Sequence, residues 1–179
     1  LVLRRGSHTR ELQLYLAKTS TELASARALL NEGFPGNHSL VGMVINSTGQ
    51  EFENVRLMCL SEASAPLEPV SVAAVVTADH RTRTKDDRLR VRLLSTRQTK
   101  QRQGFGSYLL KNLARVGAMR GMPETFVEAA EGNEVFWKKT GFPRLDEAAR
   151  RKCWSESQKF SFSIRCRRDR SLLIVINTG

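Results

Sequence analysis

The chain has 179 residues, of which 40% are hydrophobic, and its 29 Lys and Arg outnumber 18 Asp and Glu to give a net charge of +11. This length suits one domain with a full core, and no run approaches the roughly 18 apolar residues of a membrane helix. Three widely spaced cysteines, Cys59, Cys153 and Cys166, lack metal-ligand spacing and cannot all pair, which predicts free thiols in a reducing compartment. We therefore expect a single domain over residues 1–179 that holds no metal and contacts no membrane.

The first half of the chain predicts strands and a helix in alternation. Residues 12–16 alternate like a strand, and residues 19–22 then supply hydroxyl caps and an early acid for a helix that stops at Gly33. Residues 55–60 and 70–77 are typical of two antiparallel strands joined by a polar turn.

The next predicted strand, residues 89–96, lies in a very basic part of the chain. Between residues 81 and 103 nine basic residues face two acids, so this segment carries a charge of +7. Basic and apolar residues alternate here, which predicts a strand with one cationic and one apolar side. The alternating residues are Arg88, Leu89, Arg90, Val91, Arg92 and Leu93. A second basic cluster, residues 150–152 and 165–170, suggests contact with DNA phosphates or an acidic protein patch, the alternative being a solvated face.

A glycine-containing turn follows that strand and precedes a predicted helix over residues 107–120. Two glycines let the backbone approach a ligand, and the helix directs unpaired N–H groups and its positive dipole end at an anion. The turn matches neither the dinucleotide pattern G-x-G-x-x-G nor the Walker pattern G-x-x-x-x-G-K-[ST]. We predict a different anionic cofactor here, with an ordinary strand-to-helix turn as the alternative. The residues of the turn are Gln101, Arg102, Gln103, Gly104, Phe105 and Gly106.

At this turn the chain resembles the GNAT (GCN-related N-acetyltransferase) superfamily, whose Q/R-x-x-G-x-G/A loop binds the pyrophosphate of acetyl-coenzyme A. A predicted strand at residues 124–130 follows, and then a segment similar to the second signature of the family, N-x-x-x-x-x-K-x-G-F. The matching residues are Gln101, Gly104 and Gly106 in the first signature and Asn133, Lys139, Gly141 and Phe142 in the second.

The resemblance covers residues 70–142 and implies a mixed α/β (α+β) fold. Its sheet would be twisted, mostly antiparallel, of about six or seven strands, flanked by helices and splayed between the fourth and fifth strands. We expect residues 158–177 to supply the last strands of this sheet.

The resemblance also implies a coenzyme site, in which backbone N–H groups at the splay hold the thioester carbonyl. Trp137 stands where most small-amine members carry a general-acid Tyr, and we expect it to pack against the coenzyme tail instead. The expected coenzyme-binding residues are Leu94, Ser95, Thr96, Gln101, Arg102, Gln103, Gly104, Phe105, Gly106, Ser107, Asn133, Phe136, Trp137 and Lys139.

The implied reaction is direct acetyl transfer to a lysine amine in a ternary complex, and it needs a base. A lysine ammonium, with a pKa near ~10.4, must lose a proton before it attacks. Histone-acetyltransferase relatives place a Glu on the strand before the loop, but an ungapped count reaches Arg90. Our candidates are Glu128, then Asp87 if the register shifts, then Glu131, and each also fits a plain surface carboxylate. His80, on the loop before the predicted strand, is the one histidine that we expect within reach of the site, and a solvent-exposed structural role is the alternative for it.

The motif spelling T-K-Q-R-Q-G-F-G and F-W-K-K-T-G-F is closer to nuclear histone acetyltransferases than to small-amine enzymes. We expect a histone tail as substrate, nucleosomal DNA as a possible contact, and a nuclear location, with the cytoplasm as alternative. A narrower hypothesis, carried by no single motif, is a trypanosomatid kinetochore acetyltransferase. The alternatives are acetylation of a small amine or a protein N-terminus, and a degenerate GNAT domain that only binds on chromatin.

Overall fold

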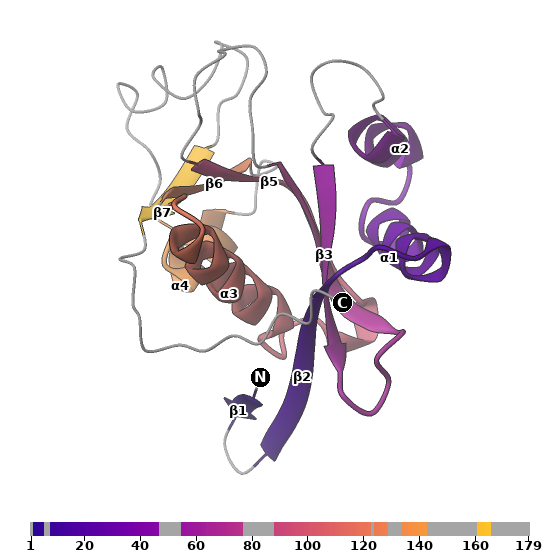
Figure 1. Ribbon diagram of the computed structural model, residues 1–179, viewed down its shortest axis with the longest axis horizontal. Coiled ribbons are helices and arrows are strands. Elements are labelled where there is room, and N and C mark those ends of the chain that lie inside the picture. The colour runs from indigo at the N-terminus through magenta and orange to yellow at the C-terminus, as the bar shows by residue number, and fades with distance from the viewer. Residues whose placement is uncertain are drawn as a thin grey trace.

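A computed structural model describes residues 2–5, 8–46, 55–76, 88–122, 124–128, 134–142 and 161–165. In them a seven-stranded sheet has the strand order of the chain (Figure 1). The strands are β1 (Val2–Arg5), β2 (His8–Leu16), β3 (Val55–Glu62), β4 (Pro69–Val76), β5 (Arg88–Thr96), β6 (Glu124–Glu128) and β7 (Ser161–Arg165). The helices are α1 (Ser20–Gly33), α2 (His38–Asn46), α3 (Phe105–Met119) and α4 (Glu134–Thr140), with a 3-10 turn η1 (Gln98–Lys100). Among the described strands only β5 and β6 pair in parallel, so the predicted mixed, mostly antiparallel sheet is confirmed.

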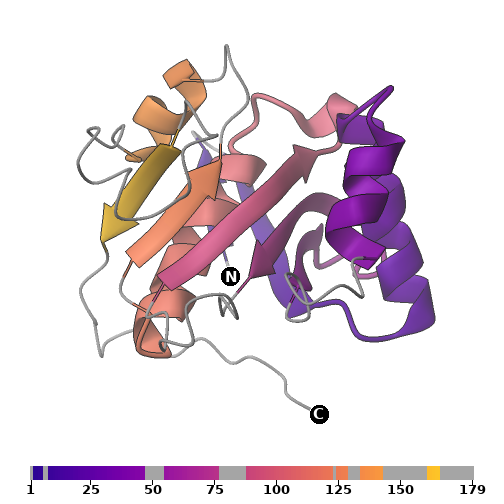
Figure 2. The ribbon, with the colours of Figure 1, turned by 90° about the horizontal axis from the view of Figure 1, so that it is seen from above.

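Helices cover both faces of the sheet. Figure 2 shows α1 and α2 on one side of the strands and α3 on the other. The core is correspondingly divided into a cluster beneath α1 and α2, which includes Leu30 and Val41, and a cluster beneath α3, which includes Phe105 and Leu109. Within the described residues no helix combines the length and apolar character that a bilayer crossing requires.

Helix α1 begins as the sequence predicts. The Thr19 hydroxyl accepts from the Glu22 N–H at 3.2 Å, and the Glu22 carboxylate accepts from the N–H groups of Thr19 and Lys18, both at 2.9 Å. These contacts form a capping box, in which two of the unpaired N–H groups at a helix start are satisfied. The N–H donors of Thr19 and Lys18 favour the charged carboxylate and hold the pKa of Glu22 below its usual 4.5.

Glu22→Gln keeps a side-chain oxygen that can accept in the capping box but removes the charge, so we expect it to lower the free energy of unfolding at pH 7 by about 0.3 to 1 kcal/mol, the usual worth of a negative charge in the first turn of a helix. Because the pKa of Glu22 is depressed in the folded protein, its stabilisation is present above pH 4.5 and is lost as the pH falls through the folded pKa. Urea unfolding at pH 7 and pH 3 tests this. A difference between wild type and variant that persists undiminished at pH 3 would contradict the assignment.

Strand β5 departs from the predicted alternation because it contains a β-bulge. Ala74 of β4 pairs with Leu93 and Val75 pairs with Val91, which leaves Arg92 as the extra residue. Leu89 and Val91 therefore pack beneath α3, whereas Leu93 packs beneath α1. The prediction of one apolar and one cationic side is wrong for this strand.

The bulge marks the place where β5 leaves β6. Residues Arg88–Val91 pair with Glu124–Val127, but residues 92–96 pair only with β4 among the described strands. Strands β5 and β6 correspond to the predicted strands at residues 89–96 and 124–130, which are the fourth and fifth of the predicted strands. The predicted splay between them is therefore confirmed.

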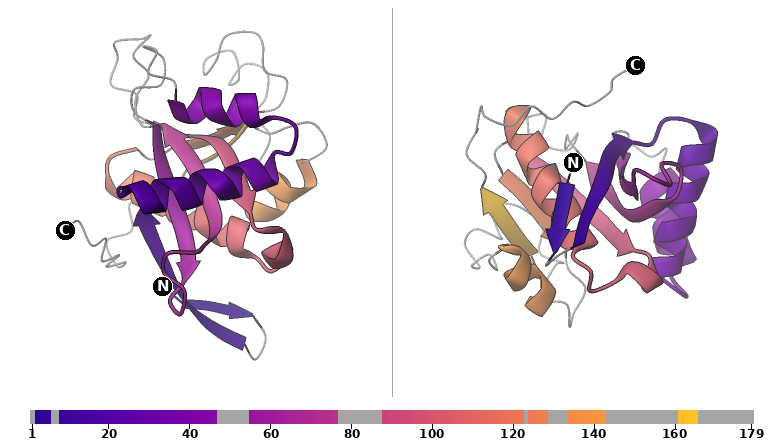
Figure 3. Two further views of the ribbon diagram at one scale, coloured as in Figure 1. Left: turned by 90° about the vertical axis from the view of Figure 1, so that its right-hand side faces the viewer. Right: turned by 90° about the horizontal axis from the view of Figure 1, so that it is seen from below.

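The sequence did not predict β1, α2, α4 or the 3-10 turn η1. Strand β1 pairs with the first half of β2 and forms a hairpin that extends beyond β3, as Figure 3 shows. Helix α2 contains Gly42 and β-branched residues that are poor helix formers, and it forms because Val41 and Val44 are buried beside α1. Of the strands predicted within residues 158–177, one is confirmed as β7, and the rest of that range lies outside the described residues.

Cys59 is a free, buried thiol on β3, as predicted for it. Burial raises its pKa to about 12 and keeps it protonated at neutral pH. Cys153 and Cys166 lie outside the described residues.

Candidate functional site

The turn from residue 101 to residue 104 has the geometry of an anion cradle. Arg102 and Gly104 both have positive φ, of 59° and 92°, and Gly104 is the N-cap of α3. The first helical hydrogen bond runs from the Tyr108 N–H to the Gly104 oxygen at 2.9 Å. The N–H groups of residues 105–107 precede that bond, so they have no acceptor within the helix and point out of its N-terminus. A Cβ on Gly104 would meet no atom within 4 Å, which leaves this end of the helix open to a ligand.

Gly106 brings the start of α3 against the end of β5. A Cβ there would lie 3.0 Å from the Thr96 Oγ1, 3.7 Å from the Phe136 ring and 3.9 Å from the Leu94 side chain. A methyl group there would have to displace the Thr96 hydroxyl by a few tenths of an ångström, so a small residue is favoured at this position. The two glycines of the motif therefore serve different purposes. Gly104 supplies the backbone conformation, and Gly106 supplies the close approach.

The end of β5 presents backbone rather than side chains to a ligand. The Ser95 hydroxyl donates to the Leu29 carbonyl of α1 at 2.9 Å, and the Thr96 hydroxyl bonds to that of Ser71 at 3.0 Å. Leu94 packs against the cluster beneath α3. Because no described strand pairs with the far edge of residues 92–96, their backbone groups on that edge are the part of β5 that can hold a ligand.

Helix α4 closes this end of the site with aromatic rings. Trp137 is only 6% exposed and makes edge-on contacts with Phe136, at 4.9 Å between ring centroids, and with Phe142, at 6.0 Å. Trp137 thus offers little surface to a coenzyme tail, and the ring that lies beside Gly106 is Phe136. Lys139 is exposed.

Comparison with known proteins supports a fold but no closer relationship. No family model and no curated protein matches the chain. Among solved structures, Tetrahymena GCN5 superposes with a TM-score of 0.67 at 8% identity, covering 88% of this chain and 98% of its own. An Elizabethkingia anophelis GNAT family acetyltransferase with acetyl-CoA bound gives 0.59 at 14% identity, covering 87% and 98%. The ribosomal-protein-S18-alanine N-acetyltransferase of Escherichia coli gives 0.59 at 14%, covering 91% and 99%.

The chain has the GNAT fold. The arrangement of the splayed strands and the turn before α3 is therefore the one that the two sequence signatures imply. Within this GNAT fold the structure brings together residues 94–96, the turn at 101–107, and Phe136.

Of the three carboxylates predicted as candidate bases, the structure describes Glu128 alone. Glu128 is the last residue of β6, where its backbone pairs with Ser161. Asp87, Glu131, Asn133 and His80 lie outside the described residues. Arg90, where the resemblance led us to look for a Glu, pairs with Val76 and Phe126 in the sheet. No group of three or more His, Cys, Asp and Glu residues in the described part of the chain could hold a metal ion.

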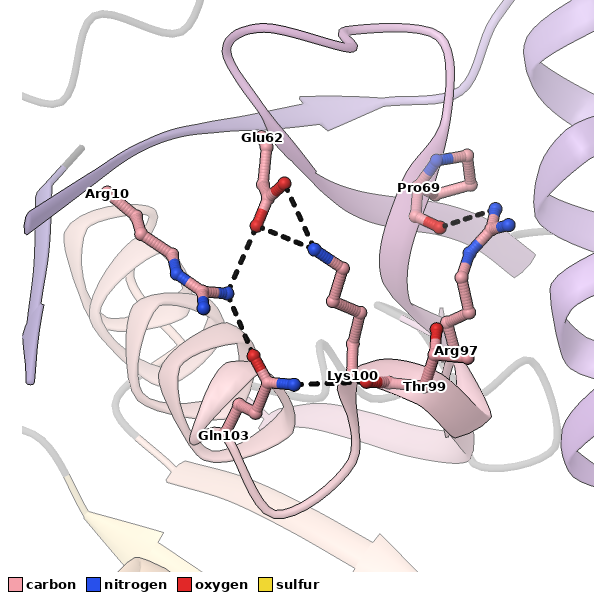
Figure 4. Close-up of polar contacts among 7 residues, drawn as sticks. All are labelled: Arg10, Glu62, Pro69, Arg97, Thr99, Lys100 and Gln103. Carbon is pink, nitrogen blue, oxygen red and sulfur yellow. Dashed lines mark hydrogen bonds and ion pairs between the residues drawn. The ribbon is translucent and has the colours of Figure 1, made fainter. Parts of the chain in front are cut away.

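Sequence reasoning missed a polar network that ties the turn to the sheet (Figure 4). Glu62, the last residue of β3, accepts from Lys100 at 3.1 and 3.2 Å and from Arg10 of β2 at 3.1 Å. The same Arg10 nitrogen lies 2.9 Å from the Gln103 side-chain oxygen, and Gln103 donates in turn to the Thr99 carbonyl at 3.0 Å. The Arg10 guanidinium also lies over the Phe105 ring, 5.2 Å from its centroid. Phe105 is fully buried, so only its backbone is available to a ligand.

A second feature that the sequence did not reveal is a pocket of about 240 Å³ on the α1 side of the same sheet end. Leu29 and Glu32 of α1 form one wall, and Leu67 and Glu68 of the turn before β4 form another. Arg97, which donates to the Pro69 carbonyl at 3.3 Å, contributes to the lining (Figure 4). The pocket thus combines apolar surface with two carboxylates in a chain that is otherwise strongly basic.

Proposed function

We propose that this protein is an acetyl-coenzyme-A-dependent N-acetyltransferase that acetylates a lysine side chain of a protein, a histone tail in the first instance. The observation that carries the proposal is the adjacency of two open backbone features. The N-terminus of α3, with Gly104 as its cap, packs through Gly106 against the end of β5, in the part that has left β6. An acyl carrier with phosphates at one end and a thioester at the other requires both.

The described residues fit such a carrier. The N–H groups at the start of α3 would hold its pyrophosphate, since a helix N-terminus favours negative charge. The free edge of residues 92–96 would receive its amide-containing arm in the manner of an added strand. Phe136, beside Gly106, would supply apolar contact to that arm.

The chemistry divides between the bound coenzyme and the chain. Acetyl-CoA supplies an activated acyl group when bound. Backbone N–H groups of residues 94–96 would polarise its carbonyl. A preorganised donor of this kind lowers the activation barrier by roughly 3 to 4 kcal/mol. The lysine ammonium must first give up a proton, and Glu128 stays our first candidate to accept it, with Asp87 and Glu131 as alternatives.

The basic surface supports a partner that carries negative charge, and we propose nucleosomal DNA. Helix α3 has no acidic residue, and its outer side presents Lys111 and Arg115, with Arg120 directly after its last turn. These cations suit contact with phosphates without sequence reading. A nuclear location on chromatin, including the kinetochore, goes with this proposal, with the cytoplasm as the alternative.

The pocket beside α1 would then bind a basic side chain that flanks the acetylated lysine. We expect Glu68→Lys to lower kcat/KM for a basic histone peptide about threefold to tenfold, the effect of one lost and reversed surface ion pair. Coenzyme A affinity should not change, because the pocket lies on the other side of β5 from α3. Steady-state kinetics with Glu11→Lys, an exposed carboxylate on β2, as the matched control tests this. Equal losses in the two variants would show only a general charge effect.

The function itself is tested by coenzyme A release from acetyl-CoA in the presence of single core histones, nucleosomes, polyamines and N-terminal peptides. Release with one histone, mapped by mass spectrometry to an internal lysine, would support the proposal. Faster reaction with polyamines or N-terminal peptides would transfer the protein to the small-amine or N-terminal class.

A binding module without activity is the second candidate, and one observation favours it. Arg90 replaces the Glu that histone-acetyltransferase relatives carry on this strand, and an arginine does not accept a proton. Tight coenzyme binding with no release on any of these acceptors would support this reading.

A further inference from the structure

The carboxylate of Glu62 lies next to the turn that we propose binds phosphate, and it belongs to neither sequence signature. It ends β3, and its side chain is 24% exposed, between Arg10 at 39% and Lys100 at 30%. Two cations thus share one carboxylate, and the three side chains together carry a charge of +1. By long-range electrostatics alone a negative charge at this position would oppose the binding of an anion.

The contacts of Glu62 reach both ends of the turn. Lys100 ends η1, just before the turn, and is held by both carboxylate oxygens. Gln103 precedes the Gly104 cap and is held by Arg10, which Glu62 holds in turn. Glu62 thus contacts Lys100 directly and Gln103 through Arg10. Each of these hydrogen bonds has a charged donor, and charge-assisted bonds are stronger than neutral ones.

The backbone between Lys100 and Gln103 has a conformation that requires support from its surroundings. Arg102 has φ 59°, a left-handed conformation that residues with a side chain rarely adopt and that persists only where the surroundings fix it. The following N–H groups can face one ligand only while this conformation is kept. Glu62 thus acts on the site through Lys100, Arg10 and Gln103.

We infer that Glu62 is a positioning residue, which holds the turn at residues 101–104 in the conformation that preorganises the N-terminus of α3 for a phosphate-bearing ligand. The identity of that ligand as coenzyme A rests on the proposed function. The positioning itself is a property of the protein without ligand.

The sign of the effect on coenzyme A binding separates positioning from simple repulsion. Glu62→Gln removes the charge, and Glu62→Asp keeps the charge but shortens the reach. If Glu62 positions the turn, both variants bind coenzyme A more weakly, and we expect Kd to rise about tenfold for the Gln variant. If it only repels phosphate, the Gln variant binds more tightly and the Asp variant binds as the wild type does.

Calorimetry with coenzyme A and steady-state kinetics with acetyl-CoA provide the measurement, with Glu11→Gln as the matched control. The exposed Glu11 side chain lies on β2, directly after Arg10, and is not part of the network around Glu62. For Glu62→Gln we expect KM for acetyl-CoA to rise with Kd while kcat stays within about twofold, because the reacting atoms are not touched. Unchanged or tighter coenzyme binding by Glu62→Gln would overturn the inference.

Hydrogen exchange of the ligand-free protein keeps this test separate from that of the proposed function. In Glu62→Gln the hydrogen-bonded amides of Lys100, Gln101 and Tyr108 should exchange faster, while those of α1 should not change. Faster exchange at these amides alone, together with no coenzyme A binding by wild type, would refute the cofactor and keep the positioning role. Unaltered exchange would refute the positioning role whether or not coenzyme A binds.

Discussion

Gly104→Asp will abolish coenzyme A binding without unfolding the protein. Asp tolerates positive φ better than most residues, and the left-handed conformation costs it about 1 to 2 kcal/mol. Its carboxylate lies beside the first N–H groups of α3, at the positive end of the helix dipole, which returns about 0.3 to 1 kcal/mol. Those groups are the donors proposed for phosphate, so the variant should stay near wild-type stability while its site is filled by its own carboxylate.

Gly121 provides the matched control at the other end of the same helix. It has φ 85° against 92° for Gly104, and a Cβ there also meets no atom within 4 Å. An Asp at Gly121 faces the negative end of the α3 dipole and gains no cap, so it should destabilise more than Asp at Gly104. Calorimetry with coenzyme A and thermal unfolding of both variants decide the matter. Gly104→Asp, the more stable variant, should lose coenzyme A binding, and Gly121→Asp, the less stable one, should keep it. Binding kept by Gly104→Asp and lost by Gly121→Asp would contradict the anion-site assignment.

The elements that the sequence predicts well are those with local causes. The start of α1 is set by Thr19 and Glu22 within one turn of each other, and the start of α3 follows from Gly104. Both glycines of the turn could be found in the sequence because their conformational and steric roles leave few alternatives to glycine. The splay was inferred from the family resemblance, and the pairing of β5 with β6 confirms it.

The features that the sequence misses depend on distant partners. In the sequence Arg92 resembles one more member of an alternating strand. Only the pairing of its neighbours Val91 and Leu93 with consecutive residues of β4 shows that it forms a bulge. Glu62 is separated from Arg10 by 52 residues and from Lys100 by 38, so each resembles an ordinary solvated charge. Trp137 matches a family position, but its burial depends on the packing of Phe136 and Phe142 around it.

The junction of α1 with β5 is another such long-range contact, and we expect Gly33→Ala to destabilise the protein strongly. A Cβ on Gly33 would overlap the Ser95 hydroxyl and lie 2.7 Å from the Ser95 Cβ, which is too close to the strand backbone to move easily. Overpacking of this kind costs about 1 to 3 kcal/mol, and it outweighs the gain of about 1 kcal/mol that Ala gives over Gly in a helix.

The Ser95→Gly background tests that cause directly. Ser95→Gly alone loses the bond to the Leu29 carbonyl and is itself destabilising. Combined with Gly33→Ala it makes room for the new methyl group, so the double variant should be more stable than the sum of the single effects by about 1 to 3 kcal/mol. Ser61→Gly, a buried strand serine that bonds to Tyr15 and Pro66 instead, should combine additively with Gly33→Ala. Coupling at Ser95 and none at Ser61, measured by urea unfolding, would show that the end of α1 fixes the open segment of β5, on which the proposed acyl site depends. Equal coupling at both serines would mean that Gly33→Ala acts through a general loosening of the core.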